Sequence, residues 1–281
     1  MTDGPIRRHL SREVAFTGVG VHTGADASCV VGPGADGIVF ARSDGAGAVR
    51  ASWRNVVVTR LATVLAADGV EVRTVEHLMS ALAALGITDA VIRVDGPEVP
   101  ILDGSAAPFR TALAEVAEPT GAAPVVKVLR AVSVAAKGAF AALIPSTGRC
   151  FDVAIDFEDA AIGLQRVTFD LDRGDYASEV APARTFGRVK DIDAMRRRGY
   201  GRGASLANAV AVDGSRVVNP EGLRMADEFA RHKLLDAIGD MALAERPILG
   251  LYRSHKAGHR LNYALLRRLF ASRENFQLLP N

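Results

Sequence analysis

The sequence predicts an α+β fold in which two similar domains of layered sheet and helices pack helix against helix. Each half of the 281-residue chain shows alternating, strand-like segments first and helix-like segments later. A faint internal repeat supports a duplication, because EHLMSALAALG and RHKLLDAIGDMAL both place a histidine early in an apolar helix. We therefore expect a first domain over residues 1–121 and a second over residues 122–281.

The composition excludes several classes of protein. A hydrophobic content of 49% with mixed charges is typical of a globular chain, and a net charge of +2 argues against binding of nucleic acid. The sequence shows neither a signal-peptide core nor an apolar run of membrane-spanning length. Cys29 and Cys150 lack metal-ligand spacing and are typical of a reducing compartment. We expect a cytoplasmic monomer with no transmembrane segment.

The elements of the first half follow from alternation and turn residues. SREVAFTGVGVHTGADASCVVGP predicts two strands around a glycine loop, in which His22 is expected to have a backbone partner. GIVFAR and residues 63–72 continue the strands, with a DG hairpin turn. Thr74 can cap the helix TVEHLMSALAALG, and DAVIRVDGPEVP returns to strand. Ser105 can cap a second helix, and EPTGAAP (118–124) is the predicted linker.

The second half repeats this order. VVKVLRAVSV, GAFAALIP, CFDVAIDFED and QRVTFDL predict strands. A polar helix from Arg188 to Arg198 then precedes a glycine loop and the apolar strand SLANAVAV. A long helix follows over residues 223–247, ended by Pro247, and then the strand ILGLYRSHKAG and the helix HRLNYALLRRLFAS.

The long helix carries the first candidate site residues. At about 100° per residue, His232, Asp236 and Asp240 share one stripe, and the helix is apolar nearly all round, which indicates burial. Buried imidazole and carboxylate groups need partners, and a divalent metal is one. An ordinary structural His–Asp pair at i,i+4 is the other interpretation.

If His77 meets His232 across the helix interface, then together with Asp236 they form a three-ligand set that leaves a fourth tetrahedral position for water. Glu76 is then placed as a general base, although a carboxylate also suits the first turn of a helix. Lys233 can stabilise an oxyanion or be a surface cation.

An acid partner for that base is suggested by the last helix. His259 alone would be a cap or a surface residue. Beside Asp240 it could be held charged and serve as a proton donor. A base and an acid on opposite sides of a metal suit attack of water on an amide and protonation of the leaving amine.

Six motifs in this order resemble one family: TGVGVHTG, TVEHLMSALAALGI, VPILDGSAAPF, ARTFG, EFARHKLLDAIGD and KAGHRLN. They are similar to the UDP-3-O-acyl-N-acetylglucosamine deacetylases, zinc amidases of lipid A biosynthesis. The resemblance implies two similar α+β domains, each with a small insert, and an acylated UDP-amino sugar as substrate. It implies zinc, or Fe²⁺ in its place, on three ligands: His77, His232 and Asp236.

The resemblance also implies roles for the remaining site residues. Glu76 would be the base, Lys233 and the Thr185 hydroxyl the oxyanion partners, and His259 the acid, oriented by Asp240. The second insert, near residues 188–212, would form an apolar passage for the acyl chain, although a plain packing strand explains its sequence equally well. Three further residues match positions near the nucleotide sugar: Phe157, Phe186 and Lys256, with Lys256 facing the diphosphate. The region from Arg60 to Leu65 receives no assignment.

Two other functions remain open on the sequence. Two histidines and a carboxylate also form the facial triad of non-haem Fe(II) oxygenases, but that chemistry has no evident use for Glu76 and Lys233. A non-catalytic protein that binds sugar nucleotides could retain the metal as a structural element.

Overall fold

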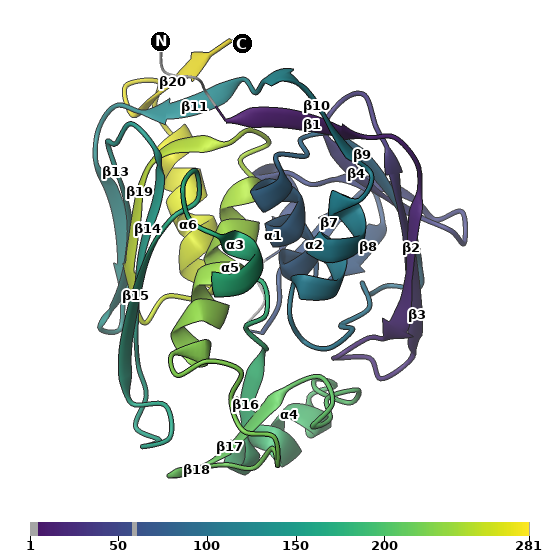
Figure 1. Cartoon of the computed structure of the whole chain (residues 1–281), viewed down its shortest axis with the longest axis vertical. Helices are drawn as coiled ribbons and strands as arrows, with labels where there is room; N and C mark the ends of the chain where they lie inside the picture. Colours follow the sequence, from purple (N-terminus) through teal and green to yellow (C-terminus); the bar gives the residue numbers. More distant parts are fainter. Residues whose placement is uncertain (1–4, 58–60, 281) are drawn as a thin grey trace.

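The structure, a computed structural model that describes residues 5–57 and 61–280, has the predicted α+β fold. Two sheets stand on opposite sides of the molecule, and helices α1 (Glu76–Leu85) and α5 (Glu228–Ala242) lie between them (Figure 1). Because both helices are covered by sheets, most of their residues are buried. Among the described residues, every helix is too short or too polar to traverse a lipid bilayer.

The two sheets share one pattern of strand pairing. In the first sheet, β9 lies between an antiparallel neighbour, β3, and a parallel neighbour, β4. In the second sheet, β19 lies in the same way between β13 and β14. Helix α1 precedes β9 along the chain and α5 precedes β19, so the two helices hold equivalent places. This arrangement supports the duplication that the histidine-containing repeat suggested.

The strands of the first sheet, in order across it, are β2 (Val14–Val19), β3 (Asp26–Pro33), β9 (Ala90–Asp95), β4 (Ile38–Arg42) and β5 (Gly47–Arg50). The corresponding strands of the second are β12 (Val132–Ala136), β13 (Ala139–Ile144), β19 (Ile248–His255), β14 (Arg149–Asp156) and β15 (Leu164–Asp170). The other helices of the two halves are α2 (Ala107–Ala114), α3 (Tyr176–Glu179) and α6 (His259–Phe270).

The predicted linker is largely a strand. β10 (Ala117–Ala122) pairs antiparallel with β1 (Ile6–Leu10), which satisfies the backbone groups that a free linker would expose to water. β11 (Val125–Val128) instead joins the second sheet, between β19 and β20 (Phe276–Leu279). The change of partners falls between Ala122 and Val125, and the boundary between residues 121 and 122 stays a prediction.

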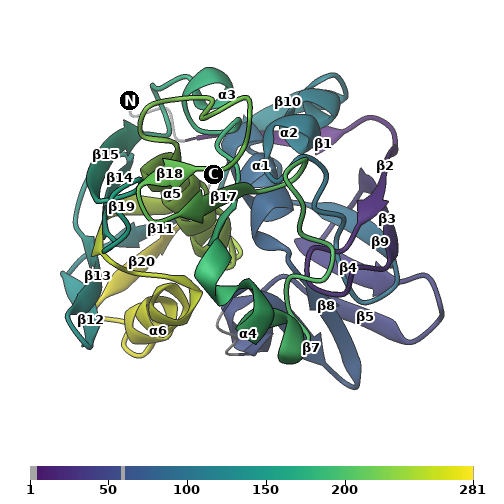
Figure 2. The same cartoon turned by 90° about the horizontal axis from the view of Figure 1, so that it is seen from below.

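Each half carries extra strands before its buried helix. β6 (Val56–Val57), β7 (Val64–Ala67) and β8 (Val70–Arg73) precede α1. The predicted DG hairpin joins β7 to β8, and Asp68 and Gly69 have the positive φ angles, 50° and 82°, that a two-residue turn of type I′ requires. Before α5, the chain forms β16 (Phe186–Arg188), α4 (Ile192–Arg197), β17 (Val210–Asp213) and β18 (Arg216–Val217). This second group projects from the body of the molecule at the bottom of Figure 1, and Figure 2 shows it from below, in front of the rest.

Three local predictions about helices and strands were wrong. The long helix begins at Glu228 rather than Leu223, because the Glu228 carboxylate accepts hydrogen bonds from the backbone of Arg184 and Arg224 and holds the preceding residues in turns. The polar helix is only α4, and the apolar strand after it starts at Val210.

Thr74 does not cap α1. Its φ angle is +59°, and its hydroxyl donates a hydrogen bond to Glu98 rather than accepting one from the helix. Helix α1 therefore begins without any side-chain cap. The N-cap residue of α2 is Ala106, which has no side-chain cap; Ser105, one residue earlier, accepts a hydrogen bond from Ala107 N through its Oγ.

Candidate metal centre

Side chains from both buried helices converge at one point. His77 on α1 and His232 and Asp236 on α5 each offer a ligand atom, and these atoms all lie within 4.8 Å of one another. The Nε2 atoms of His77 and His232 are 3.7 and 3.5 Å from Asp236 Oδ1. The two imidazole rings lie nearly perpendicular, at 84°, with centroids 5.0 Å apart. The geometry therefore brings the sequence-predicted ligands together.

The hydrogen bonds of this cluster fit a bound cation. Asp236 Oδ2 accepts a hydrogen bond from Lys233 Nζ at 2.8 Å, whereas the buried Oδ1 has no hydrogen-bond partner in the described part of the chain. His232 Nδ1 lies 3.1 Å from the carbonyl oxygen of Ala183, so a proton on Nδ1 leaves the Nε2 lone pair facing Asp236. A buried carboxylate oxygen without a partner, facing imidazole nitrogens, is the donor set of a tetrahedral divalent metal site.

Electrostatics keep the three groups in their ligand forms. Burial lowers the pKa of His77 to about 3 and also lowers the pKa of His232, so both rings are neutral at pH 7. Burial raises the pKa of Asp236, but the Lys233 ammonium and the histidines lower it further, and the net pKa lies well below its usual range. A neutral imidazole and an ionised carboxylate are the species that bind metals.

On one side of the cluster stands a buried carboxylate. Glu76 Oε2 accepts a hydrogen bond from the backbone N of Thr63 at 3.1 Å, and Oε1 lies 3.6 Å from His259 Nε2. Burial raises the pKa of Glu76 to about 7 in spite of the nearby His259. A carboxylate with that pKa can accept a proton near neutral pH.

Next to this carboxylate, and not across the cluster from it as the sequence predicted, stands a charged histidine. His259 Nδ1 lies 2.8 Å from Asp240 Oδ2, and Nε2 lies 3.9 Å from Asp236 Oδ2. Burial lowers the pKa of His259, but the Asp240 and Glu76 carboxylates raise it more, to about 10. His259 is thus a proton donor whose Nε2 faces the ligand cluster.

Sequence reasoning missed two residues that hold this pair. Thr63 Oγ1 donates to Asp240 Oδ1 at 2.6 Å, and Asn262 Nδ2 donates to Asp240 Oδ2 at 2.8 Å. Asn262 stands three residues after His259, within a motif already singled out, so helical spacing could have found it. Thr63 lies in the segment left unassigned; Arg60 of that segment lies outside the described residues.

The aromatic residues assigned to substrate lie beside the cluster. The Phe186 ring meets the His232 ring edge-on, with centroids 6.1 Å apart, and it contacts the Phe157 ring at 5.6 Å. Lys233 Nζ stands 5.4 Å from the Phe186 centroid. Lys256 is paired with Asp156 at 2.9 Å at a half-exposed position.

Two remaining residues of interest occupy connecting segments. The backbone of Thr185 is fixed by hydrogen bonds to Gly104 and Val210, and the role of its hydroxyl stays a prediction. His22 is buried in its loop, and its Nδ1 accepts a hydrogen bond from Gly201 N at 3.3 Å, which is the backbone partner expected.

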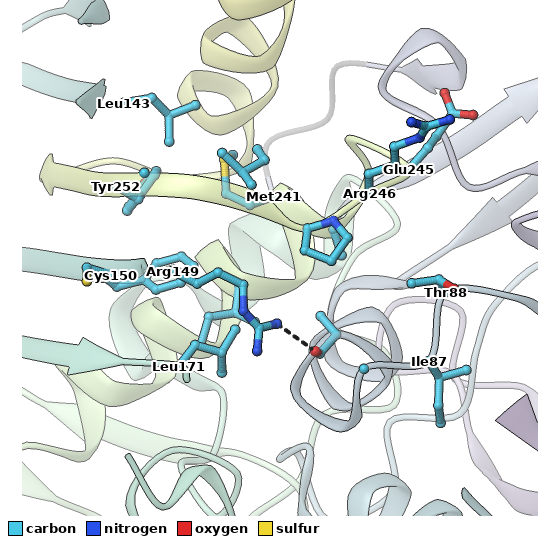
Figure 3. Close-up of a pocket in the computed structure, with 18 of the residues that line it drawn as sticks. Ile87, Thr88, Leu143, Arg149, Cys150, Leu171, Met241, Glu245, Arg246 and Tyr252 are labelled. Atoms are coloured by element: carbon cyan, nitrogen blue, oxygen red, sulfur yellow. Dashed lines mark hydrogen bonds between the residues drawn. The ribbon is translucent and has the colours of Figure 1, made fainter. Parts of the chain in front are cut away.

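A separate cavity lies on the other side of α5 (Figure 3). It measures about 750 Å³ when its open mouth is included, and Ile238, Met241 and Ala242 of α5 line it. Arg149 at its wall donates a hydrogen bond to the carbonyl oxygen of Ala83, near the end of α1. None of the metal-cluster residues lines this cavity.

A candidate metal-ligand set with a buried base and a charged acid beside it defines the class: a metal-dependent hydrolase. Comparison with known proteins agrees. The family model of UDP-3-O-acyl N-acetylglycosamine deacetylase matches residues 7–271, and the chain belongs to this family.

Three relatives named UDP-3-O-acyl-N-acetylglucosamine deacetylase illustrate the similarity. The protein of Myxococcus xanthus (strain DK1622) is 44% identical over 98% of this chain and 89% of its own length. That of Phenylobacterium zucineum (strain HLK1) is 45% identical over 91% and 90%. That of Acidithiobacillus ferrooxidans (strain ATCC 53993 / BNL-5-31) is 42% identical over 97% and 92%.

Proposed function

We propose that this chain hydrolyses the N-acetyl group of UDP-3-O-acyl-N-acetylglucosamine in lipid A biosynthesis and releases acetate. The observation that carries this proposal is the Asp236 Oδ1 atom, which has no hydrogen-bond partner among the described residues and faces His77 and His232. Glu76 and His259 stand together beside this cluster. Family membership supplies the substrate, and the cluster supplies the means of hydrolysis.

His77, His232 and Asp236 would hold a zinc ion. Two imidazoles and one carboxylate leave a fourth position of a tetrahedral site free for water. When bound in such a site, zinc lowers the pKa of a water to about 7 and polarises a carbonyl oxygen. Iron(II) accepts the same donors and is the alternative metal.

Glu76 takes a proton from the attacking water. Its burial favours the neutral acid as the product of that transfer, and the Thr63 amide fixes the orientation of the carboxylate. The water oxygen forms a bond to the acetyl carbon, and negative charge develops on the acetyl oxygen. Lys233, held beside the cluster by Asp236, stabilises that charge together with the Thr185 hydroxyl.

His259 then completes the reaction. As the C–N bond breaks, the glucosamine nitrogen becomes basic and needs a proton. His259 carries that proton on Nε2, on the side that faces Glu76 and Asp236, while Asp240 holds Nδ1. The products are acetate and the free amine of the UDP sugar.

Residues around the metal cluster contact the nucleotide, the sugar and the acyl chain of the substrate. Phe157 and Phe186 contact the nucleotide sugar, and Lys256 exchanges its partner Asp156 for the diphosphate. The insert over residues 188–212 forms the apolar passage for the acyl chain, and the exposed side chains of Val189 and Leu206 support this. Because one chain supplies the whole ligand set, we propose that the enzyme acts as a monomer, in the cytoplasm.

The decisive experiment changes Glu76 to Gln. The variant should retain its metal but release acetate with a kcat roughly 10²–10⁴ lower, because it has lost its general base. Metal analysis and an acetate assay on the UDP sugar measure both quantities. Undiminished kcat would contradict the role of Glu76 as the base. A wild-type protein that releases no acetate, with a biological function that Glu76→Gln leaves intact, would favour a binding protein. Activity with zinc under anaerobic conditions, without a 2-oxo acid, separates the hydrolase from an Fe(II) oxygenase.

A further inference from the structure

A buried carboxylate away from the metal ligands connects two parts of the proposed site. Glu98, just after β9, is 1% exposed. It accepts hydrogen bonds from the backbone N of His22 and of Thr23, both at 2.9 Å, and from Thr23 Oγ1 at 2.7 Å. The Oε1 atom of Glu98, which accepts from His22 N, also accepts a hydrogen bond from Thr74 Oγ1 at 2.8 Å. It forms no ion pair with Lys or Arg within the described ranges, so these donors must stabilise its charge.

The donors from His22 and Thr23 belong to the loop over residues 20–24, which is hydrogen-bonded to the projecting insert. Gly203 N donates to the carbonyl oxygen of Val21 at 3.1 Å, and Arg202 N donates to that of His22 at 3.3 Å. Gly201 N donates to Nδ1 of His22. The loop therefore fixes the turn that follows α4 in the insert.

This seam between loop and insert is tightly packed. A Cβ on Gly20 would lie 2.3 Å from Glu98 Oε2, and a Cβ on Gly203 would lie 2.3 Å from the carbonyl oxygen of Gly20. Real Cβ atoms do not approach so closely, so the carboxylate, the loop and the insert are packed with no space for a side chain at either glycine.

The other donor, Thr74, stands at the start of α1. A φ angle of +59° is unfavourable for a β-branched residue and persists only when its surroundings hold it. Glu98 holds its hydroxyl, while its backbone N donates to the carbonyl oxygen of Thr63 at 3.0 Å. Thr74 is two residues before Glu76, the first residue of α1. The contact with Glu98 therefore helps to fix the position of Glu76 and His77.

We infer that Glu98 is a positioning residue that couples the acyl-chain passage to the catalytic end of α1. The hydrogen bonds from His22 and Thr23 hold the insert and so affect the preference for acyl-chain length. The hydrogen bond from Thr74 holds the start of α1 and so affects turnover through Glu76. The inference rests on the proposed function, because it needs the insert to contact the acyl chain. Glu98 itself touches neither the metal ligands nor the reacting atoms.

Single hydroxyl deletions separate the two sides. Thr23→Val removes one donor on the loop side, and we expect a roughly tenfold loss of kcat/KM, through KM, on the long-chain substrate and little loss on its 3-O-acetyl analogue. Thr74→Ala removes the donor on the helix side, and we expect a roughly tenfold loss of kcat on both substrates. Thr23→Ser and Thr74→Ser keep the hydroxyls and should restore each parameter.

A second measurement does not depend on activity. In Glu98→Gln, the amide protons of Gly201, Arg202 and Gly203 should exchange with solvent at least tenfold faster than in the wild type. Asp152→Asn is the matched control: it weakens another buried carboxylate, bound to Arg166 and Arg253 away from the seam, and should leave exchange in the insert unchanged.

The outcomes are distinct. Equal losses on both substrates for Thr23→Val, or unchanged exchange of the insert amides in Glu98→Gln, would overturn the coupling. A wild-type enzyme that releases no acetate from either substrate would instead overturn the proposed function. The exchange result would then still decide whether Glu98 holds the insert.

Discussion

The backbones of Gly239 on α5 and Glu76 on α1 are in direct contact. A Cβ built on residue 239 would lie 2.1 Å from the carbonyl oxygen of Glu76 and 3.2 Å from its Cα. The absence of a side chain at this one position allows the two helices to approach closely enough for His77 to reach His232 and Asp236.

Gly239→Ala should therefore separate the helices. Alanine normally stabilises a helix by about 1 kcal/mol relative to glycine, but here its methyl group would overlap the backbone of α1. We expect a lower melting temperature and loss of bound metal. Ala242→Gly at the end of the same helix is the control, which should cost less than about 1 kcal/mol of stability and keep full metal content. A metal-replete, stable Gly239→Ala protein would show that the contact is not needed.

Asp236→Ala should deplete metal and activity together, because it removes the one anionic ligand and the partner of Lys233. Metal content after purification and acetate release measure the two effects. Asp156→Ala removes a carboxylate that pairs with half-exposed Lys256, away from the ligand cluster, and it should keep its metal. Full metal content in Asp236→Ala would remove this residue from the ligand set.

His259 in the metal-free protein should titrate near pH 10, because the Asp240 and Glu76 carboxylates outweigh the effect of burial. NMR titration of the imidazole measures this pKa, and Asp240→Asn should lower it. The folded-state pKa of His259 lies above the unfolded value of about 6.5. The charged His259 therefore contributes its full free energy of folding below pH 6.5, and this contribution is lost as the pH rises through 10. The stability gap between the wild type and Asp240→Asn should narrow over that range. An unchanged pKa in the variant would contradict the pairing.

Leu206→Ala in the insert should change the preference for acyl-chain length more than it changes the chemical step. Leu206 is 43% exposed, so the substitution should cost little stability. Rates on substrates of several chain lengths test this, with Leu278→Ala on β20, at 42% exposure, as the control. An equal loss of rate at all lengths would place the acyl chain elsewhere.

Helical periodicity was sufficient to align His232, Asp236 and Asp240, because a regular helix converts spacing in sequence directly into a shared face. The strand alternation of each half likewise predicted the two sheets. The contact between Thr63 and Asp240 could not be predicted in this way, since 177 positions separate the two residues and only the packed fold brings them together. The start of α5 at Glu228 depends in the same way on Arg184, which lies in another segment.

The division of the ligands between α1 and α5 also affects the folding of the protein. An ion that binds only when the two equivalent helices are in contact stabilises that contact by mass action, by about 2.7 kcal/mol at a free concentration one hundred times its Kd. Metal binding and docking of the two repeats are thus linked equilibria, so a cell short of the metal would hold a less stable protein as well as an inactive one.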